Sequence, residues 1–270
     1  MSWTSLLKKE WKASSTMFGI GLLALLTIYL LIYFGMGHYS PFLLLLAFAA
    51  IFAHLLAVGL DLLGSLRKEW KENTVYIWMN LPLPGWQLLL SKLLITFIQF
   101  VVSLLITLVF TYIFINRAID LFQQRVNGQE HAIAMETVRS TFIEMVPYFL
   151  LVIPFISVLL ALGVAFIFLM SKVTRPFGGV IGAVLIGGFF YGYILLIHTN
   201  LFATMTHWGF IRNFAFPEQI MFQGGSETAI DVGQEILHPL YIGQIFFGVV
   251  VLFGMFVLLS WLLDRKVQVG

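Results

Sequence analysis

The 270-residue sequence predicts an all-α integral membrane protein with six transmembrane helices. Composition points to this class first, because 60% of the residues are hydrophobic and only 10% are charged, whereas soluble domains carry roughly 25% charged residues. The mean hydropathy of +0.96 agrees with this. Six separate apolar runs are long enough to cross a bilayer, which takes about 20 residues in a helix. Basic residues also gather in alternate connecting segments, as they do in multi-pass proteins.

The six spans are expected where apolar residues continue for the length of a bilayer crossing. They cover residues 17–36, 41–63, 93–116, 145–171, 176–197 and 239–263. Five of these runs contain no charged residue, and the second carries only His54 and Asp61. The first run follows several lysines but is too long for the apolar region of a cleavable signal peptide, so we expect it to be retained. We therefore expect residues 1–270 to form a single transmembrane domain.

Residues 1–15 form an amphipathic segment, in which Trp3, Leu6, Leu7 and Trp11 alternate with three lysines at helical spacing. Apolar and aromatic side chains opposite lysines are typical of a helix that lies in the membrane interface. We expect this segment to form such an interfacial helix along the inner leaflet before the first span.

Lys and Arg are distributed unevenly among the segments that connect the spans. Most of the 15 basic residues lie at the N-terminus, between spans two and three, between spans four and five, or in the C-terminal tail. Most of the acidic residues lie in the other connections. Because basic connecting segments remain in the cytoplasm, we expect both termini and residues 64–92 to be cytoplasmic.

Two of the external connections are long. Residues 117–144 contain few helix breakers apart from Asn127-Gly128, so they either extend the flanking helices or form a surface helix. Residues 198–238 are rich in Phe and Trp, and residues 207–222 are too short and too polar to span but too apolar for a free loop. We expect a re-entrant or interfacial element here, with a folded cap as the alternative.

His54 and Asp61 lie seven residues apart in the second span and so share one helix face. An ionisable side chain at the centre of a span costs about 2.5–3.5 kcal/mol on insertion scales, which marks it as a functional candidate. A proton relay or a pair of metal ligands would use both residues. A metal site needs a third ligand, however, and the chain contains no HExxH motif and no cysteine. Water near the cytoplasmic end and contacts with neighbouring helices are the structural alternatives.

Glycines in the fifth span favour close helix packing. Gly178-x-x-x-Gly182 and Gly188-x-x-x-Gly192 each place two small residues on one helix face, for a contact within the molecule or between two copies. Two prolines in the fourth span predict a kink there.

The segment between spans two and three is amphipathic. Its apolar or weakly polar side chains recur at helical spacing at Leu66, Trp70, Thr74, Ile77, Trp78 and Leu81. Charged side chains occupy the other face, which predicts a cytoplasmic helix over residues 66–81. Pro82 and Pro84-Gly85 should end this helix. Lys92 is expected to extend its ammonium group to the inner membrane interface.

This segment resembles polytopic subunits of the ABC-2 type permease family. Members often carry E-x-x-x-G-T-x-E-x-x-x-x-x-P between spans two and three, followed by a basic residue and an apolar helix. The residues that match this pattern, in order, are Glu69, Thr74, Pro82 and Lys92. Asn73 stands in place of the glycine, and Tyr76 in place of the second glutamate. Six spans, both ends inside, an amphipathic N-terminal helix and a large outer element extend the resemblance to the organisation of the whole chain.

The resemblance implies the membrane-spanning permease subunit of an ATP-driven exporter. In such transporters the helix between spans two and three is a coupling helix, and two permeases, identical or paralogous, work with two ATPase subunits. The residues implied to contact the ATPase are Glu69, Trp70, Thr74, Ile77, Trp78 and Pro82. The chain has no G-x-x-x-x-G-K-[ST] phosphate loop. ATP and Mg²⁺ would therefore bind to the partner, and the chain itself is not expected to be an enzyme.

The resemblance also implies a bacterial plasma-membrane protein that moves a hydrophobic or amphipathic cargo outward, with peptide toxins or antimicrobial peptides favoured. The transport path would lie between two permeases, lined by spans one, two and five. No catalytic residue, cofactor site or nucleic-acid partner is expected. Two other functions stay open: a proton-coupled secondary transporter that uses His54 and Asp61, and a non-transporting immunity or sensor subunit.

Overall fold

The computed structural model describes residues 3–75, 83–124, 128–174, 176–214 and 238–265. Six long helices dominate it, and each is long and apolar enough to cross a membrane, which confirms a multi-pass membrane protein of the all-α class. The long helices are α1 (Trp3–His38), α2 (Leu44–Lys71), α4 (Gly85–Gln123), α5 (Gln129–Val173), α6 (Gly178–Ile197) and α8 (Ile242–Arg265). The shorter elements are the 3-10 turn η1 (Pro41–Leu43), helix α7 (Asn200–Thr206) and the antiparallel strands β1 (Phe210–Phe214) and β2 (His238–Tyr241).

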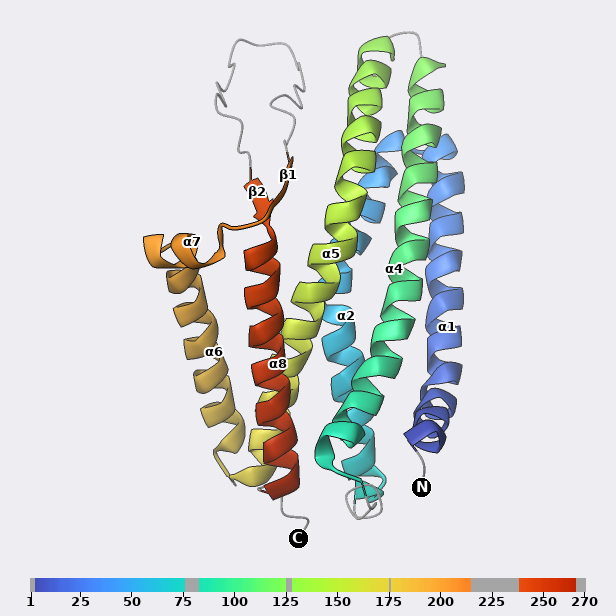
Figure 1. The fold of residues 1–270 in the computed structure, drawn as a ribbon. Coiled ribbons are helices and arrows are strands. Elements are labelled where there is room, and N and C mark those ends of the chain that lie inside the picture. The colour runs from blue at the N-terminus through green and yellow to red at the C-terminus, as the bar shows by residue number, and fades with distance from the viewer. Residues whose placement is uncertain (1–2, 76–82, 125–127, 175, 215–237, 266–270) are drawn as a thin grey trace.

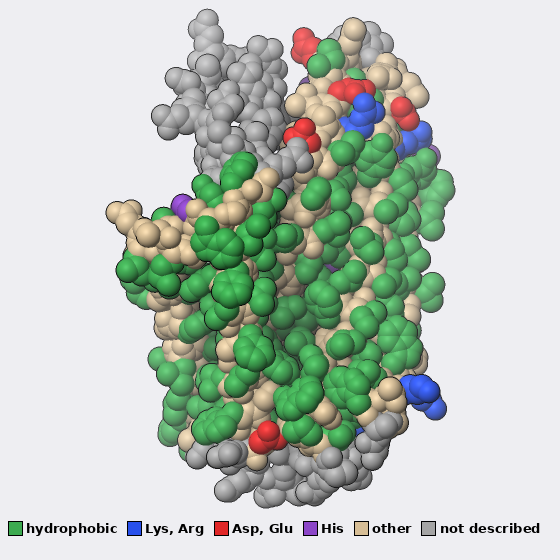
Figure 2. All heavy atoms as spheres, viewed as in Figure 1, with side chains coloured by type: hydrophobic (Ala, Val, Ile, Leu, Met, Phe, Trp, Pro, Cys, Tyr) green, Lys and Arg blue, Asp and Glu red, His purple; other side chains and the backbone are tan. Residues whose placement is uncertain are grey.

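The six long helices run side by side, and both chain ends lie at the same end of the bundle, which we call the terminal end (Figure 1). Helices α2 and α5 end there, and α4 and α6 begin there. On the face drawn in Figure 2, apolar side chains cover the broad middle of the bundle and charged side chains gather near its two ends. An apolar belt between two charged ends is the surface that a bilayer favours, because charges are costly in its hydrocarbon core.

Helix α2 lies against both α4 and α5, whereas α1 packs chiefly on α4 and touches α2 little. Two hydrogen bonds between side chains join α1 to α4. Tyr29 Oη donates to Thr107 Oγ1 at 2.7 Å, and Gln99 Nε2 donates to Ser14 Oγ at 2.8 Å. Lipid-facing helices gain little from burying apolar surface against each other, so such polar contacts and close packing help to set which helices pair.

Helix α6 lies at the edge of the bundle and packs on α5 through its first glycines. A Cβ atom at Gly178 would overlap the carbonyl oxygen of Met170, and one at Gly182 would lie 3.0 Å from the Met170 Cβ atom. Apart from their own helix, no described atom lies within 4 Å of a Cβ atom placed at Gly188 or Gly192. The first glycine pair therefore serves packing within the molecule, whereas the second pair lies on an uncovered part of α6.

The N-terminal amphipathic segment is not a separate helix. Helix α1 continues from Trp3 to His38, so the expected interfacial helix over residues 1–15 is, in its described part, the beginning of the first long helix. No Pro or Gly occurs before Gly19. The hydroxyl groups of Ser14 and Ser15 donate to carbonyl groups of the preceding turn. Nothing in this stretch therefore ends the helix between the amphipathic and the apolar part.

Of residues 117–144, the described residues 117–123 and 129–144 extend the flanking helices, which was one of the two expected outcomes. Helices α4 and α5 contain 39 and 45 residues, and at a rise of 1.5 Å per residue they are about 58 and 68 Å long. A bilayer core is only about 30 Å thick, and both helices project beyond their neighbours at the end opposite the terminal end (Figure 1). These helices therefore extend well beyond the spans expected from apolar runs, because a helix does not stop where its apolar residues stop. Which part of each helix crosses the bilayer stays a prediction.

The connection after α6 forms α7 and then pairs β1 with β2. Thr199 caps α7, since its hydroxyl oxygen accepts from the backbone N–H of Phe202 at 3.2 Å. Strand β2 includes Pro239, so the last long helix begins at Ile242 rather than at residue 239. Residues 215–237 lie outside the described part of the chain, and a re-entrant or interfacial element here stays a prediction.

Candidate functional site

Helix α2 ends in a left-handed turn at Asn73. The backbone φ angle of Asn73 is +55°, and the N–H of Glu72 donates to the carbonyl oxygen of Lys68 at 2.9 Å. A left-handed residue just after a helix is a common C-terminal cap, and Gly and Asn adopt that conformation most readily. Asn73 therefore suits the backbone at the position where the ABC-2 pattern has glycine.

The expected helix over residues 66–81 is wrong at its start. Residues 66–71 are the last turns of α2, and helical structure resumes only at Val75, after the turn at Asn73. The helix passes Gly64 without ending, because one glycine costs only about 1 kcal/mol inside a helix. Residues 66–71 are thus continuous with α2 up to its turn.

A buried ion cluster, which we call the Lys92 cluster, lies beside this turn. Lys92 Nζ is 2.9 Å from Glu10 Oε2 and 2.8 Å from Glu69 Oε1, and it also donates to Ser65 Oγ at 3.1 Å. The second oxygen of Glu69 accepts from Thr74 Oγ1 at 2.6 Å. The Lys92 cluster therefore joins α1, α2, the turn after α2 and α4 at one point.

The charged side chains of the Lys92 cluster are buried, unlike those of a surface ion pair. The side chains of Lys92, Glu10 and Glu69 are 1%, 6% and 10% exposed, respectively. The prediction that Lys92 reaches the membrane interface is wrong, because two carboxylates inside the bundle hold its ammonium group. A buried charge has to be paired, and here two negative charges face one positive charge. Within the described residues, Glu10 Oε1 is buried and has no hydrogen-bond partner.

Glu10 was not among the residues that the sequence singled out. It is the only acidic residue before Asp61, and it lies on the same helical face as Trp3 and Leu6. Leu6 is fully buried, and the rings of Trp3 and Trp86 are 6.3 Å apart. A lone acid on the apolar stripe of an otherwise basic helix is the signal that would have identified it.

A second contact fixes the chain where it returns to the bundle. The backbone N–H of Gly85, the first residue of α4, donates to Asp264 Oδ1 of α8 at 2.7 Å. A carboxylate is favourable at a helix N-terminus, where backbone N–H groups lack partners within the helix. A Cβ atom at Gly85 would lie 2.5 Å from the same oxygen, so glycine permits the close approach.

Trp70 packs within the molecule. Its ring meets the ring of Phe168 of α5 edge to face at a centroid distance of 5.1 Å, and Lys172 Nζ lies 5.9 Å from its ring centroid. Glu69 and Thr74 belong to the Lys92 cluster, so these three implied contact residues all touch the chain's own helices. The other implied contact residues, Ile77, Trp78 and Pro82, lie outside the described residues.

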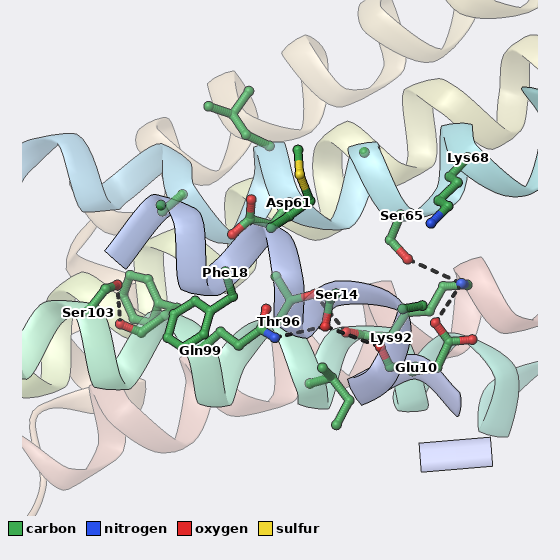
Figure 3. Close-up of a pocket in the computed structure, with 18 of the residues that line it drawn as sticks. Glu10, Ser14, Phe18, Asp61, Ser65, Lys68, Lys92, Thr96, Gln99 and Ser103 are labelled. Atoms are coloured by element: carbon green, nitrogen blue, oxygen red, sulfur yellow. Dashed lines mark hydrogen bonds and ion pairs between the residues drawn. The ribbon is translucent and has the colours of Figure 1, made fainter. Parts of the chain in front are cut away.

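A cavity of about 710 Å³ lies between α1, α2 and α4 and reaches the Lys92 cluster. Both His54 and Asp61 line it, so the structure brings these two predicted residues to one space. In Figure 3, Asp61 points from α2 into the gap toward α1, and the hydrogen bond between Gln99 and Ser14 crosses from α4 to α1 beside it. The cavity thus has charged groups at the terminal end and a mixed apolar and polar lining further in.

His54 is held by its own helix and by neighbours. Its Nδ1 atom lies 2.7 Å from the carbonyl oxygen of Ala50, and because a carbonyl only accepts, Nδ1 carries a proton. The ring lies 5.9 Å from the ring of Phe100, and Ser157 Oγ donates to the His54 carbonyl oxygen at 3.1 Å. Among the described residues, no three His, Asp or Glu side chains are grouped to hold a metal ion.

Comparison of the chain with family models, with curated proteins and with solved structures found no match.

Proposed function

We propose that the chain is the permease subunit of an ATP-driven exporter and that residues 72–84 are the segment on which a separate ATPase acts. One observation carries the proposal. Three residues that match the ABC-2 pattern, Glu69, Thr74 and Lys92, meet in one buried cluster. Lys92 follows Glu69 by 23 residues and lies 2.8 Å from its carboxylate, so these members of the pattern have a physical reason to occur together.

The contacts at the two ends of this segment suit the transmission of a force. Before the segment, the Lys92 cluster joins α2 to α1 through Glu10 and to α4 through Lys92 itself. After the segment, the bond from Gly85 to Asp264 joins α4 to α8. Short charge-assisted hydrogen bonds in a buried network resist deformation. A displacement of the segment would therefore move four helices together.

The surface at the tip of α2 is a suitable contact for a soluble partner. The exposed side chains there are Arg67, Lys68, Lys71, Glu72 and Asn73. Their predominantly positive charge would favour an acidic groove on the partner and would steer its approach. In the proposed transporter this end of the bundle is cytoplasmic, a second permease copy completes the path, and a hydrophobic or amphipathic cargo, such as a peptide, moves outward.

Co-purification tests the proposal. The tagged chain is purified from membranes of its native host, and bound proteins are identified by mass spectrometry. We expect a subunit with a phosphate-binding loop and ATPase activity, and we expect the Arg67→Glu/Lys71→Glu double variant to lose most of it. The matched control is Lys8→Glu/Lys12→Glu, which reverses two exposed charges on α1 and should keep the subunit. Absence of an ATPase from the wild-type sample would contradict the function, and equal recovery with both double variants would contradict the contact surface.

A second function is favoured by one observation, namely that His54 and Asp61 line the same cavity. A proton-coupled transporter would work without an ATPase. In liposomes that contain only this chain, a pH gradient would then drive uptake of a hydrophobic probe, and His54→Ala and Asp61→Asn would abolish it. Uptake that needs ATP and the partner subunit would exclude this function.

A further inference from the structure

The cavity between α1, α2 and α4 has a lining that the proposed coupling role does not explain. Away from the Lys92 cluster, α1 contributes Met17, Phe18 and Leu22 to it, and α2 contributes Leu60 and Asp61. Its volume of about 710 Å³ falls within the range of roughly 300–1,000 Å³ that small-molecule sites occupy. Polar side chains of Ser14, Thr96 and Gln99 line it as well. Apolar walls beside an isolated carboxylate suit a ligand that carries both apolar groups and a charge.

Asp61 is the charged group that the bundle leaves uncompensated in this part of the cavity. Among the described residues, no hydrogen bond or ion pair engages its carboxylate, whereas Lys92 is committed to Glu10 and Glu69. The remaining charged side chains around the cavity are Lys9, Lys68 and Glu72. Lys68 is seven residues further along α2, which is about 10 Å along the helix axis. The described residues thus pair no cation with the exposed Asp61 carboxylate, which leaves it available to a cation on a bound molecule.

Aromatic rings that line the same cavity favour an organic cation over a metal ion. Phe18 and Phe100 both line the cavity, and aromatic faces attract ammonium and related cations. Figure 3 shows Phe18 on α1 between Asp61 on α2 and Gln99 on α4. A metal ion would need several oxygen or nitrogen ligands at short distance, and the described residues contain no such group of acidic and imidazole side chains.

The cavity opens sideways between α1 and α2. Met17 of α1 and Leu60 of α2 line it and are nevertheless 75% and 65% exposed, so they form a rim on the outer surface of the bundle. Helices α1 and α2 touch each other little. In a membrane this rim faces lipid, and a ligand with apolar groups would reach the cavity from the bilayer.

We propose that this cavity binds hydrophobic organic cations that enter from the lipid. The positive charge lies beside the Asp61 carboxylate and the rings of Phe18 and Phe100, and the apolar groups lie against Met17, Leu22 and Leu60. That such a cation is the exported cargo rests on the proposed function, whereas the binding itself does not.

Equilibrium binding of radiolabelled tetraphenylphosphonium to the purified chain in dodecyl maltoside tests this inference. The detergent is an uncharged amphiphile in large excess, so it competes for any site that recognises apolar groups alone. We expect saturable binding of about one cation per chain. Asp61→Asn should weaken it at least about tenfold, because the cation loses its only close counter-charge in an apolar site. Asp61→Glu should keep most of the affinity, and Asp120→Asn, which removes an exposed carboxylate at the other end of the bundle, should change nothing.

Two further measurements decide the result if Asp61→Asn reduces the yield of folded protein. Ala57→Phe fills the cavity and keeps the carboxylate, and it should also abolish binding. Tetraphenylborate has the same shape with the opposite charge and should not bind measurably. Unchanged affinity in Asp61→Asn, or equal affinity for the borate, would overturn the inference. No ATPase or nucleotide is present, so a negative result leaves the proposed coupling to an ATPase untouched.

Discussion

Replacement of Lys92 by methionine should destabilise this protein more than any other single charge deletion at the terminal end. The change removes the ammonium group that lies 2.9 Å from Glu10 Oε2 and 2.8 Å from Glu69 Oε1. Methionine fills a similar volume, so the main consequence is electrostatic. Two carboxylates would remain buried at 6% and 10% exposure with no ion-pair partner among the described residues.

The expected loss follows from the cost of leaving a buried charge unpaired. Removal of one partner from a buried ion pair costs about 3–5 kcal/mol. A chain of this length shifts its unfolding midpoint by about 2–4 °C per kcal/mol, so Lys92→Met should lower the midpoint by roughly 6–20 °C. Glu10→Gln should cost less, because the pair between Lys92 and Glu69 survives. Adding Glu10→Gln and Glu69→Gln to Lys92→Met removes the unpaired charges and should restore most of the lost stability.

Thermal unfolding of the purified variants in detergent, followed by helical circular dichroism, measures these differences. Lys12→Met is the matched control, since Lys12 is exposed on α1 and makes no ion pair among the described residues. An unchanged midpoint for Lys92→Met, or a loss no larger than that of Lys12→Met, would refute the assignment of a buried cluster. A triple variant less stable than Lys92→Met alone would refute the electrostatic reason for the loss.

Three other changes have definite expected outcomes. Asn73→Val should cost about 1–2 kcal/mol, because a β-branched residue is strained at φ +55°, whereas Asn73→Gly should stay close to wild type in the same thermal assay. Gly85→Ala should lower the stability by about 1–3 kcal/mol, because the added methyl group overlaps the Asp264 carboxylate that the Gly85 N–H binds. Its control is Gly254→Ala, in open space on α8, which should leave the stability unchanged or raise it by up to about 1 kcal/mol. The chain contains no cysteine, so single cysteines report orientation: in intact cells an impermeant maleimide should label Glu130→Cys and spare Lys8→Cys. The reverse labelling would show that the chain has the orientation opposite to the predicted one.

Much of the fold could be predicted because the bilayer imposes it on each segment separately. A crossing helix needs a long apolar run whatever its neighbours are, so the number of long helices followed from the sequence. Helix ends did not follow, because they depend on caps and turns rather than on hydrophobicity. Residues 66–71 belong to α2 since the left-handed turn lies at Asn73, and residues 1–15 belong to α1 where they are described, since nothing interrupts the helix.

The candidate site was predictable only in part. The resemblance to the ABC-2 pattern singled out Glu69, Thr74 and Lys92, and the sequence itself singled out His54 and Asp61 as ionisable residues in an apolar run. The sequence could not predict that Lys92 is buried. A lysine at the end of a span extends to water unless a carboxylate on another helix pairs with it. Only the tertiary structure decided that Glu10, 82 residues away in the chain, does so. The cavity at Asp61 likewise depends on the tertiary structure, because α1 packs on α4 rather than on α2. The sequence of one segment does not reveal which helices pack together.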